Sequence, residues 1–250
     1  MRGGSTEGDS KDALTDQWHL VSIMIPTYNE VSNIGILIEK LEALPFRKEI
    51  IVIDDGSSDG TVEVVKNLMR RYNNIKLLLR PRRMGIGSAY RDGLKLATGK
   101  IVAQLDADLS HRPEDLPGLV EELMANCLDV VIGSRYVKGG ATIGWPFYRY
   151  ALSYGMCLLA RLLLRLRVRD SLSGYKVYRK PVYEFLTARR KADGFADFEI
   201  EMVYLAKKYG LKVKEVPIVF KNRETGSSKI SILDIISVLK SVLRLCLQKR

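Results

Sequence analysis

The 250-residue sequence predicts one α/β domain built on a doubly wound, mostly parallel β-sheet. Three observations predict this fold class. Short, almost continuous apolar runs alternate with helical patterns between residues 19 and 134. The runs have the length and composition of strands that are buried on both faces. Each run also ends in a polar segment, and chains that alternate strand and helix in this way form parallel sheets with right-handed crossovers.

The first half of the chain supplies five predicted strands and four predicted helices. Helical spacing of apolar residues covers 31–44, 61–72, 88–97 and 114–125. At the start of the second helix, Ser58 or Asp59 is placed to act as the N-cap, and neighbouring glycines permit the turn. The apolar runs that predict strands are residues 19–26, 48–55, 74–79, 99–106 and 128–134.

The pattern changes after residue 140. Residues 143–169, rich in Leu and Arg, predict one long amphipathic helix. Shorter helices are predicted at 181–188 and 197–209, a strand pair at 211–221, and a last amphipathic helix at 231–247. Residues 1–17 lack the apolar stretch of a secretion signal and are interpreted as a disordered tail. The predicted organisation is therefore a tail at 1–17, one domain at 18–230, with 143–169 as an amphipathic helix, and a C-terminal amphipathic helix within 231–250.

Positive charge is concentrated in the second half of the chain. Residues 1–140 carry 18 basic and 20 acidic side chains, whereas residues 141–250 carry 22 and 9, which accounts for the net charge of +11. Such a basic half indicates an anionic partner: a nucleic acid, a phosphorylated substrate or an anionic membrane surface. The widely spaced Cys127, Cys157 and Cys246 argue against a disulfide framework or a zinc site.

Two carboxylates follow the fourth predicted strand in the segment LDADLSH. Asp106 and Asp108 are two positions apart, so their side chains can point into the same crevice. Carboxylate oxygens suit Mg²⁺ or Mn²⁺, which complete their shells with water and substrate phosphates. A solvated junction in which Asp serves the turn is the alternative interpretation. The polar ends of the four neighbouring strands favour the metal site, because ligands of such sheets bind beyond the carboxyl ends of the strands.

Two other strand ends carry weaker signals. Asp55 is placed to accept hydrogen bonds from a nucleobase or ribose. Gly85 and Gly87 form a G-x-G without the remaining spacing of a phosphate loop, and alone they indicate little.

Seven segments, taken together and in this order, resemble the dolichol-phosphate mannosyltransferases of glycosyltransferase family 2. The resemblance spans about residues 20–232 and implies a GT-A, Rossmann-like fold. It also implies a divalent cation, Mg²⁺ or Mn²⁺, and transfer of mannose from GDP-mannose to a dolichyl or polyprenyl phosphate, with inversion. The segments are VSIMIPTYNEVSNI, EIIVIDDGSSDGT, MGIGSAYRDGLKLATG, DADLSHRPE, GSRYVKGG, SLSGYKVYRK and VPIVFKNRETGSSK.

The same resemblance assigns roles by position. Asp108, Arg135 and Arg223 are the implied catalytic residues. Ser110 stands where some members place a glutamine that binds the metal, so a hydroxyl or water must substitute. Pro26, Tyr28, Glu30, Ile53 and Asp55 would contact the guanosine, Asp106, Ala107 and Asp108 the metal and diphosphate, Arg135 the acceptor phosphate or the donor, and Arg223 and Lys229 the phosphates.

The implied chemistry predicts what the site should contain. A lipid phosphate is already ionised near neutral pH and needs no general base, unlike a sugar hydroxyl. Positive charge near the acceptor is therefore expected. Asp197, Glu199 and Glu201 are candidates for a base if the acceptor is a hydroxyl, although a solvated helix face is the favoured interpretation. His111 adjoins the metal segment, and a structural position beside Pro113 is favoured for it.

Other functions stay open at this point. The donor could be UDP-glucose, the acceptor a hydroxyl, and the two aspartates could serve a nucleotidyltransferase. A nucleic-acid partner is not expected, because no RNA-recognition or helix-turn-helix signature is present.

The two amphipathic helices predict that at least one of them associates with a membrane surface. The alternative interpretation is that both helices only cover the sheet. Lys240 and Arg244 argue against a membrane span in the last helix. Many members of the family continue into transmembrane helices, whereas this sequence stops after a single amphipathic segment. A membrane-anchoring subunit is a further candidate partner. We expect the protein at the cytoplasmic face of the endoplasmic reticulum or plasma membrane.

Overall fold

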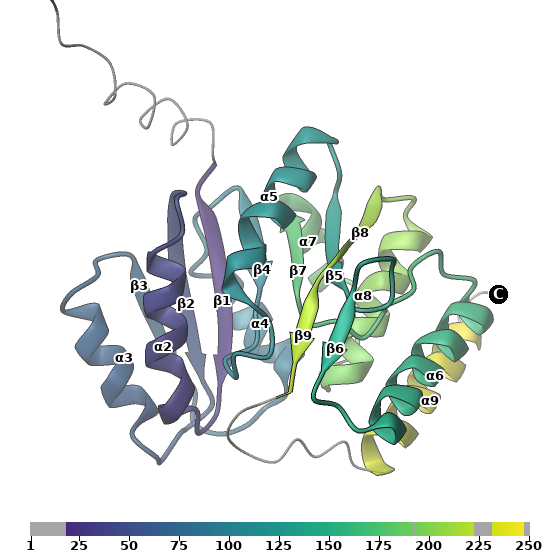
Figure 1. Cartoon of the computed structure of the whole chain (residues 1–250), viewed down its shortest axis with the longest axis horizontal. Helices are drawn as coiled ribbons and strands as arrows, with labels where there is room; N and C mark the ends of the chain where they lie inside the picture. The colour runs from purple at the N-terminus through teal and green to yellow at the C-terminus, as the bar shows by residue number, and fades with distance from the viewer. Residues whose placement is uncertain (1–18, 193, 223–231, 248–250) are drawn as a thin grey trace, which may run out of the picture.

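A seven-stranded, mostly parallel sheet forms the centre of the protein (Figure 1). The computed structural model describes residues 19–192, 194–222 and 232–247. The strand order is β3-β2-β1-β4-β7-β5-β8, and β1 pairs in parallel with both β2 and β4. The five strands expected in the first half are confirmed as β1 (Val21–Thr27), β2 (Lys48–Asp54), β3 (Ile75–Leu79), β4 (Ile101–Gln104) and β5 (Val130–Ser134).

Helices cover both faces of this sheet and create two separate cores (Figure 1). The core on one face is formed with α2 (Val31–Glu42), α3 (Thr61–Met69) and α5 (Leu116–Ala125). The other core is formed with α4 (Ile86–Leu94), α6 (Phe147–Leu164), α7 (Lys180–Thr187), α8 (Phe195–Lys208) and α9 (Ile232–Leu247). A short 3-10 helix, η1 (Pro113–Asp115), precedes α5.

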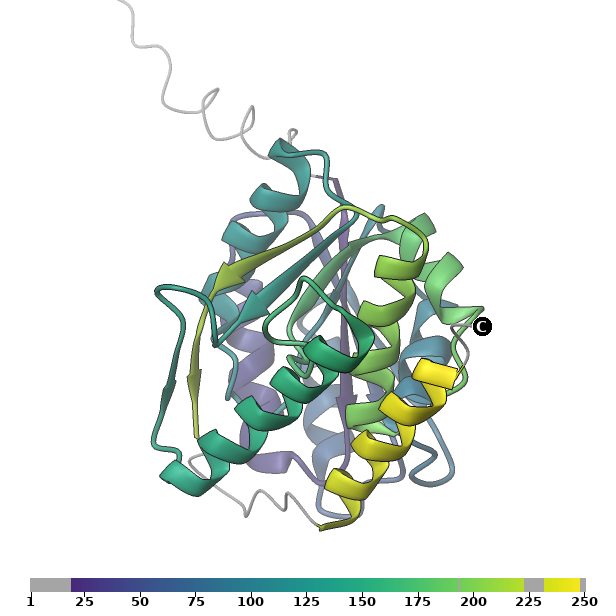
Figure 2. The same ribbon diagram turned by 90° about the vertical axis from the view of Figure 1, so that its right-hand side faces the viewer.

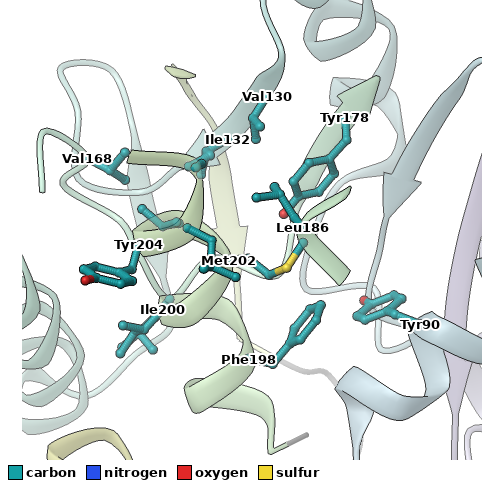
Figure 3. Packing of buried hydrophobic residues seen from close by; sticks show 14 of the residues in the cluster. Tyr90, Val130, Ile132, Val168, Tyr178, Leu186, Phe198, Ile200, Met202 and Tyr204 are labelled. Carbon is teal, nitrogen blue, oxygen red and sulfur yellow. The ribbon is translucent and has the colours of Figure 1, made fainter. Parts of the chain in front are cut away.

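Burial follows the helical and strand periods of the sequence. On α2 the fully buried residues are Ile34, Leu37, Ile38 and Leu41, which is the i, i+3, i+4, i+7 spacing of one helix face. Burial of each such side chain stabilises the fold by about 2 kcal/mol. In the core on the opposite face of the sheet, Tyr90 of α4 stacks on Phe198 of α8 with ring centroids 5.6 Å apart (Figure 3).

One central strand was not expected from the sequence. β7 (Lys176–Arg179) lies antiparallel between β4 and β5. It is only four residues long and begins with Lys176, a residue that rarely occupies a buried strand. Val177 and Tyr178 point into opposite cores, so the strand alternates as a two-faced buried strand must.

The expectation of one helix over residues 143–169 is wrong at both ends. Residues 141–143 form a strand, β6 (Ala141–Ile143), and α6 begins only after Pro146. The helix ends where Arg165 adopts a φ of 51°. Beyond it, exposed Arg165, Arg167 and Arg169 alternate with buried residues, which is a period of two rather than a helical period.

The expected strand pair near the C-terminus divides between two sheets. β8 (Val213–Pro217) pairs in parallel with β5, whereas β9 (Val219–Lys221) pairs in parallel with β6. The expected last helix is present as α9, and Figure 2 shows it beside α6. Figure 1 shows both helices at the end of the molecule opposite β3. Within the described ranges, none of the helices is both long and apolar enough for a membrane crossing.

Candidate active site

The loops after β1 and β2 are joined to each other at the carboxyl edge of the sheet. The Asn29 side-chain oxygen accepts a hydrogen bond from the Ser58 amide at 3.0 Å. The two carboxylate oxygens of Asp59 accept from the amides of Val31 and Thr61, each at 3.0 Å. One carboxylate therefore serves the first residue of both α2 and α3, as expected for Asp59, although Gly60 occupies the N-cap position of α3.

Asp55 and Tyr28 lie on these loops with two arginines beside them. The Arg80 guanidinium nitrogen Nη1 lies 3.0 Å from Asp55 Oδ1, and the Arg83 guanidinium carbon lies 4.8 Å from the centre of the Tyr28 ring. Burial raises the pKa of Asp55, although the charge of Arg80 acts in the opposite direction. An exposed aromatic ring such as that of Tyr28 can stack on a base, and a carboxylate such as that of Asp55 can accept hydrogen bonds from the N–H groups of the base.

The other three residues expected to contact guanosine, Pro26, Glu30 and Ile53, differ in their burial. Pro26 is half-buried at the end of β1, and half-buried Glu30 accepts a hydrogen bond from the Asn33 side chain at 2.8 Å. Ile53 is fully buried, and a Cβ added to Gly93 would lie 2.8 Å from its Cδ1 atom. The side chain of Ile53 therefore belongs to the core beneath α4 and does not line the edge of the sheet.

The metal segment directly follows β4. Asp106 keeps 20% of its side chain exposed, whereas Ala107, Asp108 and Ser110 are buried. The Ser110 amide donates to Asp108 Oδ1 at 3.0 Å, and the Ser110 hydroxyl donates to the same oxygen. The hydroxyl of Ser110 is therefore engaged with Asp108 in this structure.

The residues present fit a hard divalent cation that shares its shell with substrate. Among the described residues, no three His, Cys, Asp or Glu side chains are grouped so that they could hold a metal ion by themselves. A cation bound by Asp106 and Asp108 would take its other oxygens from water and phosphates, as Mg²⁺ and Mn²⁺ commonly do.

The neutral ring of His111 beside Asp106 is compatible with a cation at this position. Its Nδ1 atom lies 3.5 Å from Asp106 Oδ2, and both of its buried ring nitrogens lack a hydrogen-bond partner among the described residues. Burial lowers the pKa of His111 to about 4, so the ring adds no positive charge near neutral pH. The ring packs against Tyr175 and Phe220, with centroids 5.1 and 4.9 Å away, which agrees with the structural position that the sequence favours.

Arg135 is held rigidly at the end of β5. Its Nε and Nη2 atoms both donate to the Asp170 carboxylate at 2.7 Å. Its guanidinium carbon lies 5.0 to 5.4 Å from the rings of Tyr136, Trp145 and Phe220. Two of its three guanidinium nitrogens thus bond to Asp170, and the residue as a whole is buried.

A second arginine, Arg149, was expected from the sequence only as one of the arginines of the amphipathic segment 143–169. Its guanidinium carbon lies 4.3 Å from the Trp145 ring, and its Nη1 donates to the Asn222 side chain at 2.9 Å. Arg135 and Arg149 therefore share one indole ring. Helical spacing in the sequence could not have indicated this contact, because Trp145 lies before α6 begins at Phe147. Paired guanidinium groups suit a phosphate.

The candidate bases do not form a solvated helix face. Glu199 is fully buried and forms an ion pair with Lys176, and Glu201 accepts hydrogen bonds from the amides of Lys191 and Ala192 at 3.0 and 2.6 Å. The favoured interpretation is therefore wrong for both glutamates, while Asp197 is half-buried. Burial raises the pKa of Glu199, with Lys176 acting against it.

The expected phosphate clamp, Arg223 and Lys229, lies outside the described residues. The chain approaches it through β9, where the Lys221 amide donates to the Ser110 carbonyl at 2.9 Å. The strand before the expected clamp thus contacts the metal segment directly.

Several characterised proteins are similar to this chain. A dolichol-phosphate mannosyltransferase of Pyrococcus furiosus is 39% identical over 229 residues, covering 90% of this chain and 63% of that protein. An undecaprenyl-phosphate mannosyltransferase of Micrococcus luteus is 32% identical, covering 84% and 87%. A polyprenol monophosphomannose synthase of Mycolicibacterium smegmatis is 34% identical, covering 84% and 80%. The chain thus spans less than two thirds of the Pyrococcus protein and most of the other two.

Solved structures share the fold. A crystal structure of glucosyl-3-phosphoglycerate synthase from Mycobacterium tuberculosis, in complex with Mn²⁺ and UDP-glucose, superposes with a TM-score of 0.70 at 24% identity. The match covers 98% of this chain and 85% of the other. The family model described as Glycosyl transferase family 2 matches residues 22–187, a range that carries Asp55, Asp106, Asp108 and Arg135. The chain is a glycosyltransferase with a GT-A fold, and it belongs to glycosyl transferase family 2.

Proposed function

We propose that the protein transfers mannose from GDP-mannose to a dolichyl or polyprenyl phosphate, with inversion at the anomeric carbon. The observation that carries the proposal is that two carboxylates and a pair of guanidinium groups occur at the carboxyl ends of β4 and β5, two strands that run in the same direction on either side of β7. Asp106 and Asp108 follow β4, and Arg135 follows β5 with Arg149 on the same indole ring. The names of the three relatives support mannose as the sugar and a lipid phosphate as the acceptor.

On the donor side, Asp106 and Asp108 would hold Mg²⁺ or Mn²⁺ against the diphosphate. When bound, the cation would neutralise the charge that develops on the departing nucleoside diphosphate. Tyr28 would stack on the base, and Asp55 would accept hydrogen bonds from its N–H groups, which guanine offers as an adjacent pair.

On the acceptor side, a phosphate oxygen would attack the anomeric carbon. The new bond joins that oxygen to the sugar, and the bond to the diphosphate breaks as GDP leaves with its electron pair. Arg135 and Arg149 would hold the acceptor phosphate. Glu199 and Glu201 are buried in contacts with the protein itself, which argues against their use as a base for a hydroxyl acceptor.

The test is a transfer assay with radiolabelled donors. We expect organic-extractable label from GDP-mannose with polyprenyl phosphate and Mn²⁺, and none when polyprenol replaces polyprenyl phosphate or when EDTA is added. Asp108→Asn should abolish the transfer, whereas Glu63→Gln, an exposed change on α3, should leave it unchanged. Transfer of label from UDP-glucose but not from GDP-mannose would contradict GDP-mannose as the donor. Transfer of label to polyprenol would contradict a lipid phosphate as the acceptor.

We further propose that α6 and α9 rest on the cytoplasmic face of a membrane. Their outward sides carry large apolar side chains, with Phe147 83%, Leu162 66% and Leu247 78% exposed. The two helices approach each other where Cys246 Sγ lies 3.6 Å from the Leu163 carbonyl, and Figure 2 shows them side by side. The sequence from 143 to 169 contains no acidic residue and five arginines, which suits anionic lipid headgroups.

Flotation with lipid vesicles tests this association. Wild-type protein should float with vesicles that contain phosphatidylglycerol and much less with pure phosphatidylcholine. Leu162→Glu with Leu243→Glu should abolish flotation, while Ile36→Glu, a change of another exposed apolar residue on α2, should not. A double variant that still floats would contradict the proposed membrane face, and self-association of wild-type protein without vesicle binding would assign the face to a second copy instead.

A further inference from the structure

A fully buried ion pair lies behind the strand-end site. Lys176 of β7 and Glu199 of α8 are both 0% exposed, and the Lys176 ammonium donates to Glu199 and to the Ser173 carbonyl. Replacing such a pair by apolar side chains is often neutral or stabilising, because taking two charges out of water is costly. Stability alone therefore gives a weak reason for this pair.

The ion pair fixes a short segment, Ser173–Tyr175, against β5. The Ser173 hydroxyl donates to the Gly133 carbonyl at 2.6 Å and accepts from the Tyr175 amide at 3.2 Å. The Gly133 amide in turn donates to the Tyr175 carbonyl at 2.9 Å. Lys176 holds the segment from the side of α8, so the segment is bound on two sides.

The middle residue of this segment, Gly174, faces the carboxylate of Asp106. A Cβ atom at position 174 would lie 3.1 Å from Asp106 Oδ2 and 3.3 Å from Oδ1. The φ of Gly174 is not in the left-handed region, so the backbone conformation does not require glycine. A side chain at position 174 would instead require the Asp106 carboxylate to move by a few tenths of an ångström.

We infer that Gly174, Lys176 and Glu199 are positioning residues that set the orientation of the Asp106 carboxylate toward the cation and the donor diphosphate. The inference rests on the proposed function, in which Asp106 is a metal ligand. Gly174 acts by leaving room for the carboxylate, and the ion pair acts by fixing the backbone of Gly174. Groups that orient metal ligands commonly change metal affinity about 10- to 100-fold when they are mutated.

Binding of Mn²⁺ in the presence of GDP, followed by electron paramagnetic resonance, provides a readout that does not depend on turnover. Gly174→Ala should weaken Mn²⁺ binding about tenfold or more. Gly35→Ala is the matched control, because its added Cβ would meet Val64 at a similar 3.3 Å, between α2 and α3. It should bind Mn²⁺ as wild type does. Unchanged Mn²⁺ binding by folded Gly174→Ala would overturn the role of Gly174.

The ion pair is tested by a double change, Lys176→Met with Glu199→Met, which removes the contact to Ser173 without leaving an unpaired charge. We expect a melting temperature near that of wild type together with Mn²⁺ binding weakened several-fold or more. A purely structural pair would change the melting temperature and not the Mn²⁺ affinity, and that result would overturn the inference. Wild-type protein that binds no Mn²⁺ with GDP would overturn the inference and the proposed metal site together.

Discussion

At the scale of single residues, Arg135 is kept in place by Asp170. Burial alone would raise the pKa of Asp170, but its bonds to Arg135 hold that pKa below the usual range. Asp170→Asn would leave a buried guanidinium without its counter-charge. We expect the free energy of unfolding to fall by about 3 kcal/mol or more, measured by urea denaturation. Lys95→Ala, which removes the exposed pair with Asp92, should change it by less than about 1 kcal/mol. Equal losses of unfolding free energy in the two variants would contradict the assignment of Asp170 as the residue that holds Arg135.

Glu49 predicts a specific dependence of stability on pH. Burial opposes ionisation, but hydrogen bonds from Lys76, Ser22 and Thr98 outweigh it and lower the pKa of Glu49 from 4.5 to about 2. Because the carboxyl binds its proton more weakly in the folded state, its contribution is complete above about pH 5 and is lost as the pH falls toward 2.

Urea unfolding at pH 6 and pH 3 measures this effect. The loss of stability between the two pH values should be smaller in Glu49→Gln than in wild type. The exposed change Glu63→Gln should lose as much stability as wild type. An identical loss in Glu49→Gln and wild type would show that Glu49 is not responsible.

Whether a site residue could be predicted from the sequence depends on how far along the chain its partners lie. Asp55, Asp106 and Asp108 could be placed from the sequence, because each stands at the end of an apolar run and parallel strands end at one edge. Asp170 and Arg149 could not, since the contacts that define them reach residues 35 and 73 positions away. Periodicity carries no information about such contacts.

At the scale of secondary-structure elements, the Asp59 carboxylate connects two helices. It accepts from the first amides of α2 and α3, and hydrogen bonds from these amides and from the Thr61 hydroxyl lower its pKa despite the opposing effect of burial. Asp59→Ala should reduce the free energy of unfolding by about 1 to 2 kcal/mol, as loss of a helix cap does. Thermal or urea unfolding measures the change, and Glu63→Ala, on α3, is the control. A loss no larger than that of the control would contradict the cap.

Elements were predictable where one period governed a long stretch. The apolar runs of β1, β2 and β4 and the stripe of α2 are examples. β7 was missed because its four residues include Lys176, whose burial depends on Glu199. The end of α6 was missed because leucines and arginines continue past Leu164 while the period changes from helical to two.

At the scale of the whole molecule, the two halves of the chain contribute different parts of one site. The first half provides the parallel strands whose ends carry Asp55, Asp106 and Asp108. The second half provides β7, inserted between β4 and β5, and the basic helix α6 with Arg149. The basic second half thus contributes α6 and Arg149 to the side proposed for the lipid phosphate, where Arg135 of the first half also lies.

The most direct test of the account is anomalous X-ray diffraction from crystals grown with Mn²⁺ and GDP. The account predicts a manganese peak within coordination distance of an Asp106 or Asp108 carboxylate oxygen, with diphosphate oxygens completing the shell. GDP bound at these strand ends with no manganese at either carboxylate would contradict it.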